Sequence, residues 1–75
     1  MARDEVLRSG QVTLDRGERI YTARYDVLKG GVVRLETGAA TQIGGSTAED
    51  VARMLLRESI SSGDADRAGL GRPKN

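Results

Sequence analysis

Cysteine, histidine, tryptophan and phenylalanine are all absent from this 75-residue chain. Without cysteine and histidine, the usual zinc ligand sets, disulfides, iron–sulfur clusters and histidine-based acid–base catalysis are excluded. Carboxylate pairs occur at Asp4–Glu5 and Glu49–Asp50. Neighbouring residues on a strand or helix point apart, however, and a chain of this size rarely builds a catalytic cleft. We therefore expect no enzymatic activity, no metal and no cofactor.

The chain also lacks long apolar runs and an excess of either charge. The longest clear apolar run is Met54–Leu56, far below the roughly 20 residues of a membrane span, and the first residues do not resemble a signal peptide. The formal net charge is +1, from 12 basic and 11 acidic residues, whereas a dedicated DNA-binding domain usually has a strong basic excess. We expect a soluble cytoplasmic protein without membrane contact.

Composition divides the chain into three segments. Residues 1–10 show no clear periodicity, and they either fray or extend a first strand. Residues 11–62 hold the periodic apolar side chains and are expected to form a single small domain. Residues 63–75 hold three glycines, the only proline and one large apolar residue, Leu70. This composition is typical of a disordered tail.

The strongest strand signal lies at residues 18–28, where apolar and polar side chains alternate. Lys29–Gly31 predicts a turn into a second strand at Val32–Glu36. A three-residue loop places apolar residues on one face and opposite charges on the other, whereas a two-residue loop mixes the faces. The expected cross-strand pairs are Tyr25–Leu35, Val27–Val33, Asp26–Arg34 and Arg24–Glu36.

Weaker alternation on either side predicts two further strands. Gln11–Leu14 precedes the turn-like Asp15–Glu18, and Thr41–Ile43 follows a turn at Gly38–Ala40. The expected pairs are Val12–Tyr21, Leu14–Arg19, Leu35–Ile43 and Thr37–Thr41. Together the strands form an antiparallel meander.

A helix is predicted after these strands. Ser46 begins a capping box that Glu49 completes, and Gly63 ends the helix. The face toward the sheet holds Ala48, Val51, Ala52, Leu55, Leu56 and Ser59, with Ile60 at its edge. The predicted fold class is therefore α+β: a three- or four-stranded antiparallel meander followed by one C-terminal helix packed on one sheet face, in the order ββββα.

Part of this pattern resembles a family of short uncharacterised bacterial proteins. Gly44–Glu49 followed by Ala52–Glu58 is similar to their C-terminal helix, and Tyr21–Tyr25 is similar to their central strand. The resemblance spans about residues 18–60. It implies a bacterial origin and brings no known activity.

Four apolar residues are expected outside the core: Met54 on the polar side of the helix, and Ile20, Leu28 and Val32 on the outer sheet face. In so small a fold, burial roughly cancels an ordering entropy of about 1.5 kcal/mol per residue. Oligomerisation would complete the core, most simply as a two-fold homodimer. We therefore predict a small non-catalytic protein-interaction module. It would bind a second copy or another protein through the helix around Met54, the outer sheet face or an edge strand.

A small dimeric nucleic-acid-binding regulator is the alternative of a different class. It would contact nucleic acid through Arg24 and Arg34 on the sheet, or through Arg53 and Arg57 on the helix. The two sheet arginines each face an acid in the expected register, and both tyrosines point toward the core. Nucleic-acid binding is therefore possible but not favoured.

A third hypothesis places an anion or small ligand at the start of the helix. The candidate residues are Gly44, Gly45, Ser46 and Thr47, because unpaired backbone N–H groups at a helix N-terminus attract phosphate. The segment lacks the lysine of a phosphate-binding loop. Glu49 and Asp50 in the same turn would repel an anion.

Overall fold

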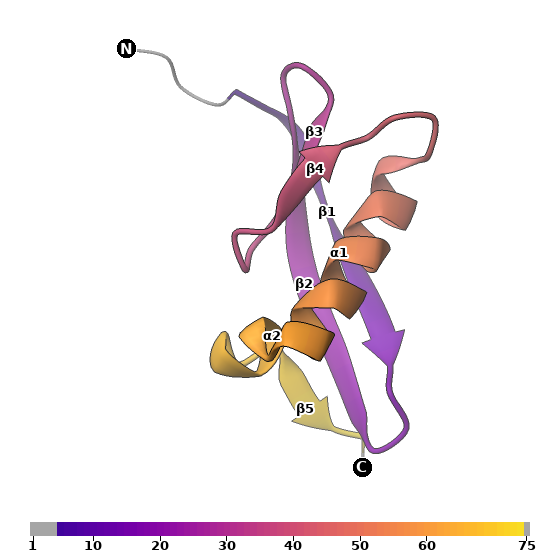
Figure 1. Cartoon of the computed structure of the whole chain (residues 1–75), viewed down its shortest axis with the longest axis vertical. Helices are drawn as coiled ribbons and strands as arrows, with labels where there is room; N and C mark the ends of the chain where they lie inside the picture. Colours follow the sequence, from indigo (N-terminus) through magenta and orange to yellow (C-terminus); the bar gives the residue numbers. More distant parts are fainter. Residues whose placement is uncertain (1–4, 75) are drawn as a thin grey trace.

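The computed structural model of the chain describes residues 5–74, which form a five-stranded antiparallel sheet with helices on one face (Figure 1). The elements are β1 (Val6–Asp15), β2 (Arg19–Leu28), β3 (Val32–Leu35), β4 (Ala40–Gln42), α1 (Ala48–Ser62), α2 (Asp64–Arg67) and β5 (Gly71–Pro73). The predicted meander followed by a helix is confirmed. Residues 6–10 extend the first strand, and residues 1–4 lie outside the described part.

Strand β2 is the centre of the sheet. Strand β1 covers one edge of β2 along most of its length. The other edge is shared by β3, which pairs with Tyr25–Leu28, and β5, which pairs with Arg19–Tyr21. Between them, the Thr22 N–H donates to the carbonyl of Leu70 at 3.3 Å. Both edges of β2 are therefore used by other parts of the chain.

The register between β2 and β3 is as predicted. Tyr25 pairs with Leu35, and Asp26 pairs with Arg34. The loop Lys29–Gly31 closes with a hydrogen bond from the Gly31 N–H to the carbonyl of Leu28 at 3.1 Å. Gly30 and Gly31 have φ values of 97° and 83°, a region that glycine enters without steric cost.

The predicted register between β1 and β2 is wrong by two residues. Val12 pairs with Ala23 instead of Tyr21. The reason is the turn, in which Gly17, at φ 82°, is the first residue of the loop between Arg16 and Arg19. Glycine commonly takes this first position in hairpin turns. An even shift keeps each side chain on the same face, so Val12 stays in the core with 2% exposure.

The predicted register between β3 and β4 is also wrong. The turn lies at Glu36–Gly38, where Gly38 has φ 98° and its N–H donates to the carbonyl of Leu35. The observed pairs are Val32–Gln42, Val33–Thr41 and Arg34–Ala40, in place of Leu35–Ile43 and Thr37–Thr41. A glycine in the left-handed region closes this turn earlier than the apolar pattern suggested.

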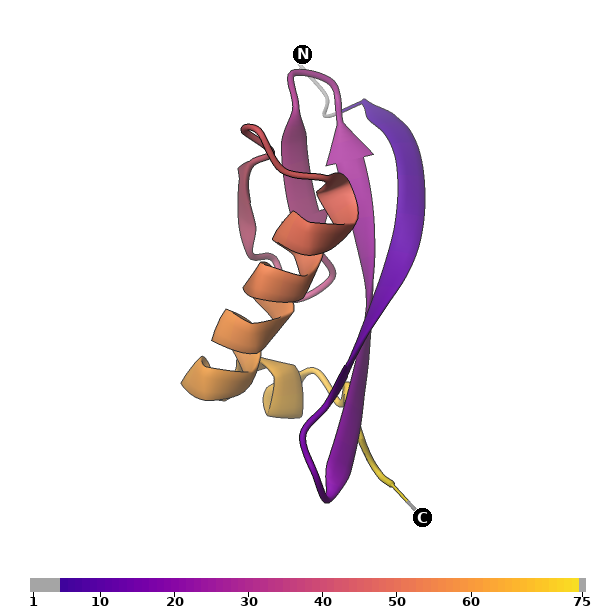
Figure 2. The same ribbon diagram turned by 90° about the vertical axis from the view of Figure 1, so that its right-hand side faces the viewer.

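Helix α1 packs its predicted face against the sheet (Figure 2). The buried residues are Ala48, Val51, Ala52, Leu55, Leu56 and Ser59. Gly63 ends the helix at φ 89°, as expected. The N-cap is Thr47 and not Ser46, because the Thr47 side chain accepts the Asp50 N–H at 3.1 Å. The Ser46 N–H donates to the carbonyl of Ile43 in the preceding turn.

The prediction of a disordered tail is wrong for residues 63–74, which contain α2 and β5. Ala65 is fully buried and Leu70 packs against the core. The Tyr21 hydroxyl donates to Asp66 at 2.8 Å, and the Lys74 ammonium lies 2.8 Å from Asp15. The polar composition of the tail is compensated by main-chain pairing with the edge of β2 that β3 leaves open.

Both tyrosines lie across glycines of neighbouring strands. A Cβ atom on Gly71 would meet the ring of Tyr21 at 2.7 Å, and one on Gly10 would meet the ring of Tyr25 at 2.6 Å. Gly71 pairs directly with Tyr21, and Gly10 with Tyr25. Each ring therefore fills the space above a residue without a side chain, an arrangement that stabilises glycine in sheets.

Candidate functional site

The four apolar interface candidates do not form one surface. Met54 is 42% exposed on α1, on the opposite side of the sheet from the other three. Ile20 and Val32 are partly exposed near opposite ends of the outer face, the sheet face that α1 does not cover. Leu28 is only 5% exposed, so it is not available to a partner.

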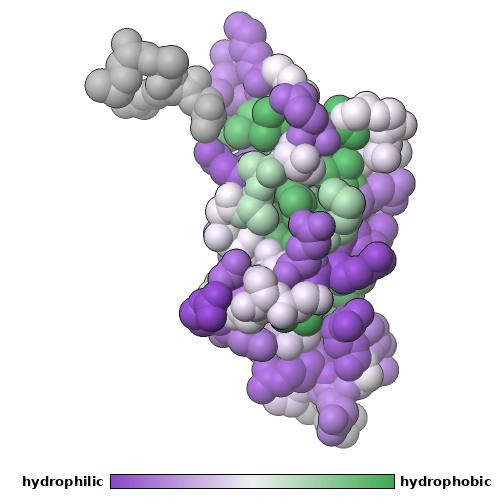
Figure 3. Space-filling view, in the orientation of Figure 1, coloured by the Kyte–Doolittle hydropathy of each residue, from purple (hydrophilic) through white to green (hydrophobic). Residues whose placement is uncertain are grey.

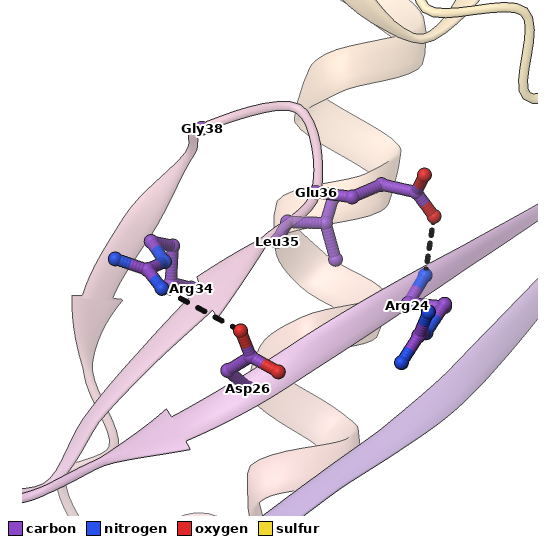
Figure 4. A pocket seen from close by; sticks show the side chains of 6 residues that line it. All are labelled: Arg24, Asp26, Arg34, Leu35, Glu36 and Gly38. Atoms are coloured by element: carbon purple, nitrogen blue, oxygen red, sulfur yellow. Dashed lines mark hydrogen bonds and ion pairs between the residues drawn. The ribbon is translucent and has the colours of Figure 1, made fainter. Parts of the chain in front are cut away.

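Two of the arginine candidates line a shallow hollow of about 410 Å³ on the outer face (Figure 4). Arg34 lies 3.5 Å from the carboxylate of Asp26. The Ser9 hydroxyl donates to Asp26 at 2.7 Å and, together with Arg34, lowers the pKa of Asp26. Glu36 accepts the main-chain N–H of Arg24 at 2.6 Å, so it bonds the backbone of its expected partner. Arg34 is therefore paired with an acid through its guanidinium group, and Arg24 bonds an acid through its main chain.

The two helix candidates lie on the other side of the sheet. Arg53 contacts Glu49, four residues before it on the helix, at 2.8 Å, and Asp50 at 3.6 Å. Arg57 is exposed on the same helix. The structure therefore does not bring the sheet arginines and the helix arginines together into one basic surface. Within residues 5–74, no group of three or more acidic side chains is placed to hold a metal ion.

The candidate anion site at residues 44–47 is an ordinary helix start. Gly44 turns the chain at φ 62°, and Thr47 caps the helix. Glu49 and Asp50 occupy the first helical turn and are both exposed. Their negative charge already complements the positive end of the helix dipole.

Strand β1 is longer than the Gln11–Leu14 segment that the alternating pattern indicated. Within residues 5–74 its only strand partner is β2, so its other edge is open over the ten residues of the strand. Val12 is its only buried residue. Val6 and Leu7, at its beginning, are 46% and 58% exposed. The sequence suggested an edge strand as one possible contact surface but did not indicate which strand it was.

The direction of the main-chain groups on β1 follows from the hairpin turn. The Arg16 N–H donates to the carbonyl of Arg19 at 2.8 Å, and the register is unbroken from Arg8 to Asp15. Because bonding alternates along an antiparallel ladder, even-numbered residues of β1 bond to β2. Ser9, Gln11 and Thr13 therefore direct their N–H and C=O groups away from the sheet. These three residues are the bonding positions of the open edge.

The other end of the sheet is less suited to pairing. Strand β4 has only three residues, and short edge strands resist association. Seen from the side that carries α1, apolar residues gather between the β3–β4 hairpin and the start of α1, whereas the end with the β1–β2 turn is polar (Figure 3). The open edge of β1 is the longest run of unpaired strand in the described residues.

Comparison with protein-family models, curated proteins and solved structures finds no match to this chain. These comparisons therefore add no activity to what the resemblance over residues 18–60 implies. No helix within residues 5–74 is long and apolar enough to cross a membrane. The geometry of the β1 edge is therefore the main basis for a functional proposal.

Proposed function

We propose that this protein is a small non-catalytic interaction module that self-associates through β1. Two copies pair their β1 strands in antiparallel fashion about a two-fold axis, so that one sheet continues through both molecules. The observation that carries the proposal is the ten-residue open edge of β1 with a single buried residue. Exposed edges of this length readily pair with another strand.

A second copy fits this edge because the edge is complementary to itself. Two-fold pairing joins the same surface of both subunits. A dimer centred on Gln11 matches the regular segment 8–14 with itself and places Ser9 opposite Thr13 of the other copy. A dimer centred on Val12 would place Arg8 opposite Arg16, and like charges in direct opposition are unfavourable. We therefore assign the Gln11-centred register.

The first test is the solution mass, measured by light scattering behind a sizing column over a range of concentrations. We expect a dimer that dissociates on dilution. Gln11→Pro should give a monomer, because proline removes the N–H that points away from β2 and leaves the bonds between β1 and β2 intact. Gln42→Pro on β4 is a matched control on the other edge and should remain dimeric. A strict wild-type monomer at every concentration would contradict the proposal.

Cross-linking tests the register, since the chain has no cysteine of its own. Two Gln11 residues in direct opposition have Cα atoms about 5.5 Å apart, a separation that a disulfide spans. Gln11→Cys should therefore form a disulfide-linked dimer on mild oxidation. Ser9→Cys alone should not, because its copies are four residues out of register, or about 13 Å apart. A mixture of Ser9→Cys and Thr13→Cys chains should cross-link.

The nucleic-acid alternative has a distinct signature. It requires retention on heparin that falls steeply with salt, and the loss of that retention in a variant with Arg24→Ala and Arg34→Ala. Strong, salt-sensitive retention by a monomeric protein would favour that alternative over self-association. The bacterial origin and the cytoplasmic location suggested by the sequence stay predictions.

A further inference from the structure

A shallow recess lies on the helix-bearing face of the sheet, beside the turn that joins β1 and β2. Its volume is about 390 Å³, and it is open to solvent. The residues that line it are Arg16, Glu18, Arg19, Tyr21, Ile60 and Pro73. They come from the β1–β2 turn, the end of α1 and β5, so the docked tail forms one wall.

Two arginines oppose one another at this recess. Arg16 and Arg19 are joined through their main chains across the turn, which places their side chains side by side on one face. Like charges in this position are unfavourable. In the described part of the chain, neither guanidinium group has a carboxylate within ion-pair distance, whereas Arg53, Arg67 and Lys74 each do. Neither Arg16 nor Arg19 is therefore held by an ion pair within residues 5–74.

The remaining wall is apolar or aromatic, with limited negative charge. Tyr21 is buried, Ile60 is partly buried against the core, and Pro73 is the last residue of β5. Glu18 is the one carboxylate that lines the recess. Asp66 lies close by and accepts the hydrogen bond of the Tyr21 hydroxyl. These two acids oppose a second negative charge on a ligand, so a ligand with one charge fits better than a phosphate dianion.

We propose that this recess binds a small organic carboxylate. Arg16 and Arg19 hold the carboxylate group through charge-assisted hydrogen bonds, and the apolar body of the ligand lies against Tyr21, Ile60 and Pro73. Guanidinium groups are suited to this task because their planar N–H donors match the two oxygens of a carboxylate. The site lies on a different surface from the open main-chain edge of β1 and does not depend on self-association.

The test is a titration of the full chain with benzoate, followed by nuclear magnetic resonance of the backbone amides. We expect saturable shifts at the amides around the recess. Acetate, which lacks the ring, and benzyl alcohol, which lacks the charge, should bind much more weakly. Equal affinity for acetate would show that the apolar residues do not contribute to binding. Equal affinity for benzyl alcohol would show that the arginines do not bind the carboxylate.

Substitutions assign the binding to the recess. Arg16→Gln and Arg19→Gln should each weaken benzoate binding by about tenfold or more, because each removes a hydrogen bond to a charged group. Arg24→Gln on the outer face is the matched control and should leave the affinity unchanged. Glu18→Gln should strengthen binding several-fold by removing repulsion, a gain that loss of folding does not produce. Shifts that never saturate, or equal losses in all three arginine variants, would refute the site.

Discussion

Two glycines paired with tyrosines have different freedom to accept a side chain. In Gly71→Ala, the new methyl group meets the ring of Tyr21, which is buried and held by Asp66. In Gly10→Ala it meets the far end of the half-buried Tyr25 side chain, which can shift at a lower cost than a buried ring. We expect Gly71→Ala to lower the free energy of unfolding by about 1–3 kcal/mol, and Gly10→Ala to lower it less.

Chemical denaturation monitored by circular dichroism measures this difference. Gly45→Ala serves as the control, because nothing lies within 4 Å of its new methyl group and Gly45 does not have a positive φ. Its effect should be small, or stabilising by about 0.4–1 kcal/mol. A loss in Gly71→Ala no greater than in Gly10→Ala would show that the ring of Tyr21 is not fixed over β5.

The Tyr21 hydroxyl gives the fold a dependence on alkaline pH. Its hydrogen bond to Asp66 raises the pKa of Tyr21 above the usual value of 10.0, and desolvation raises it further. A pKa that is higher in the folded state stabilises the protein fully below pH 10.0, and this contribution is lost as the pH rises toward the folded-state pKa. We expect the melting temperature of the wild type to fall more steeply above this pH than that of Tyr21→Phe.

The other tyrosine provides the control for this pH dependence. Tyr25→Phe keeps the Tyr21–Asp66 hydrogen bond, so it should retain the steep alkaline fall. Ultraviolet absorbance of tyrosinate in this variant should show titration above the usual pKa. Identical pH profiles for the wild type and Tyr21→Phe would rule out a contribution from this bond.

At the scale of elements, the two neighbouring hydroxyl residues at the start of α1, Ser46 and Thr47, have different roles. Only Thr47 bonds a helical N–H, that of Asp50. Thr47→Ala should therefore lower the free energy of unfolding by about 1 kcal/mol, and Ser46→Ala should change it by less than about 0.5 kcal/mol. Thermal melts of the two variants measure which substitution destabilises the protein more. A larger loss in Ser46→Ala would place the cap where the sequence pattern first suggested.

The packing of the tail gives a second prediction at this scale. Leu70 packs against the core between α2 and β5, so Leu70→Ala should lower the free energy of unfolding by about 1–2 kcal/mol. Met54→Ala removes an apolar side chain from an exposed position and should have little effect. Equal, negligible effects would mean that the tail does not contribute to the folded core.

The elements differ in how well the sequence predicts them. The buried face of α1 and the pairing of β2 with β3 follow from local patterns. The 3.6-residue period fixes which helix face is buried, and the opposite charges across the strands fix one register. The β1–β2 and β3–β4 registers depend on which residue takes the left-handed conformation in each turn. The turn at Gly17 lies one residue later than expected, and the turn that Gly38 closes lies two residues earlier. The apolar pattern is the same for any even shift.

At the scale of the whole molecule, the tail and the site could not be predicted from local patterns. Strand β5 forms because β3 leaves half of one edge of β2 open, and this depends on the lengths of strands far apart in the sequence. The recess likewise joins Arg16 to Ile60 and Pro73, three residues that only the complete fold brings together.

Self-association through β1 would couple the stability of the fold to its assembly. Anything that binds only the folded state stabilises it by mass action, and a second copy is such a ligand. A tenfold rise in concentration would stabilise each chain of a dimer by about 0.7 kcal/mol, or about 3–5 °C in melting temperature for a domain of this size.

Thermal melts at several protein concentrations measure this coupling. The melting temperature of the wild type should rise with concentration, and that of Gln11→Pro should not, because its edge N–H is missing. The oxidised Gln11→Cys dimer should also melt independently of concentration but at a higher temperature, since its two chains stay linked. A wild-type melting temperature that is constant across concentrations where light scattering detects a dimer would mean that the chains separate without loss of the fold. The open edge of β1 would then be an accessory contact of an independently stable monomer.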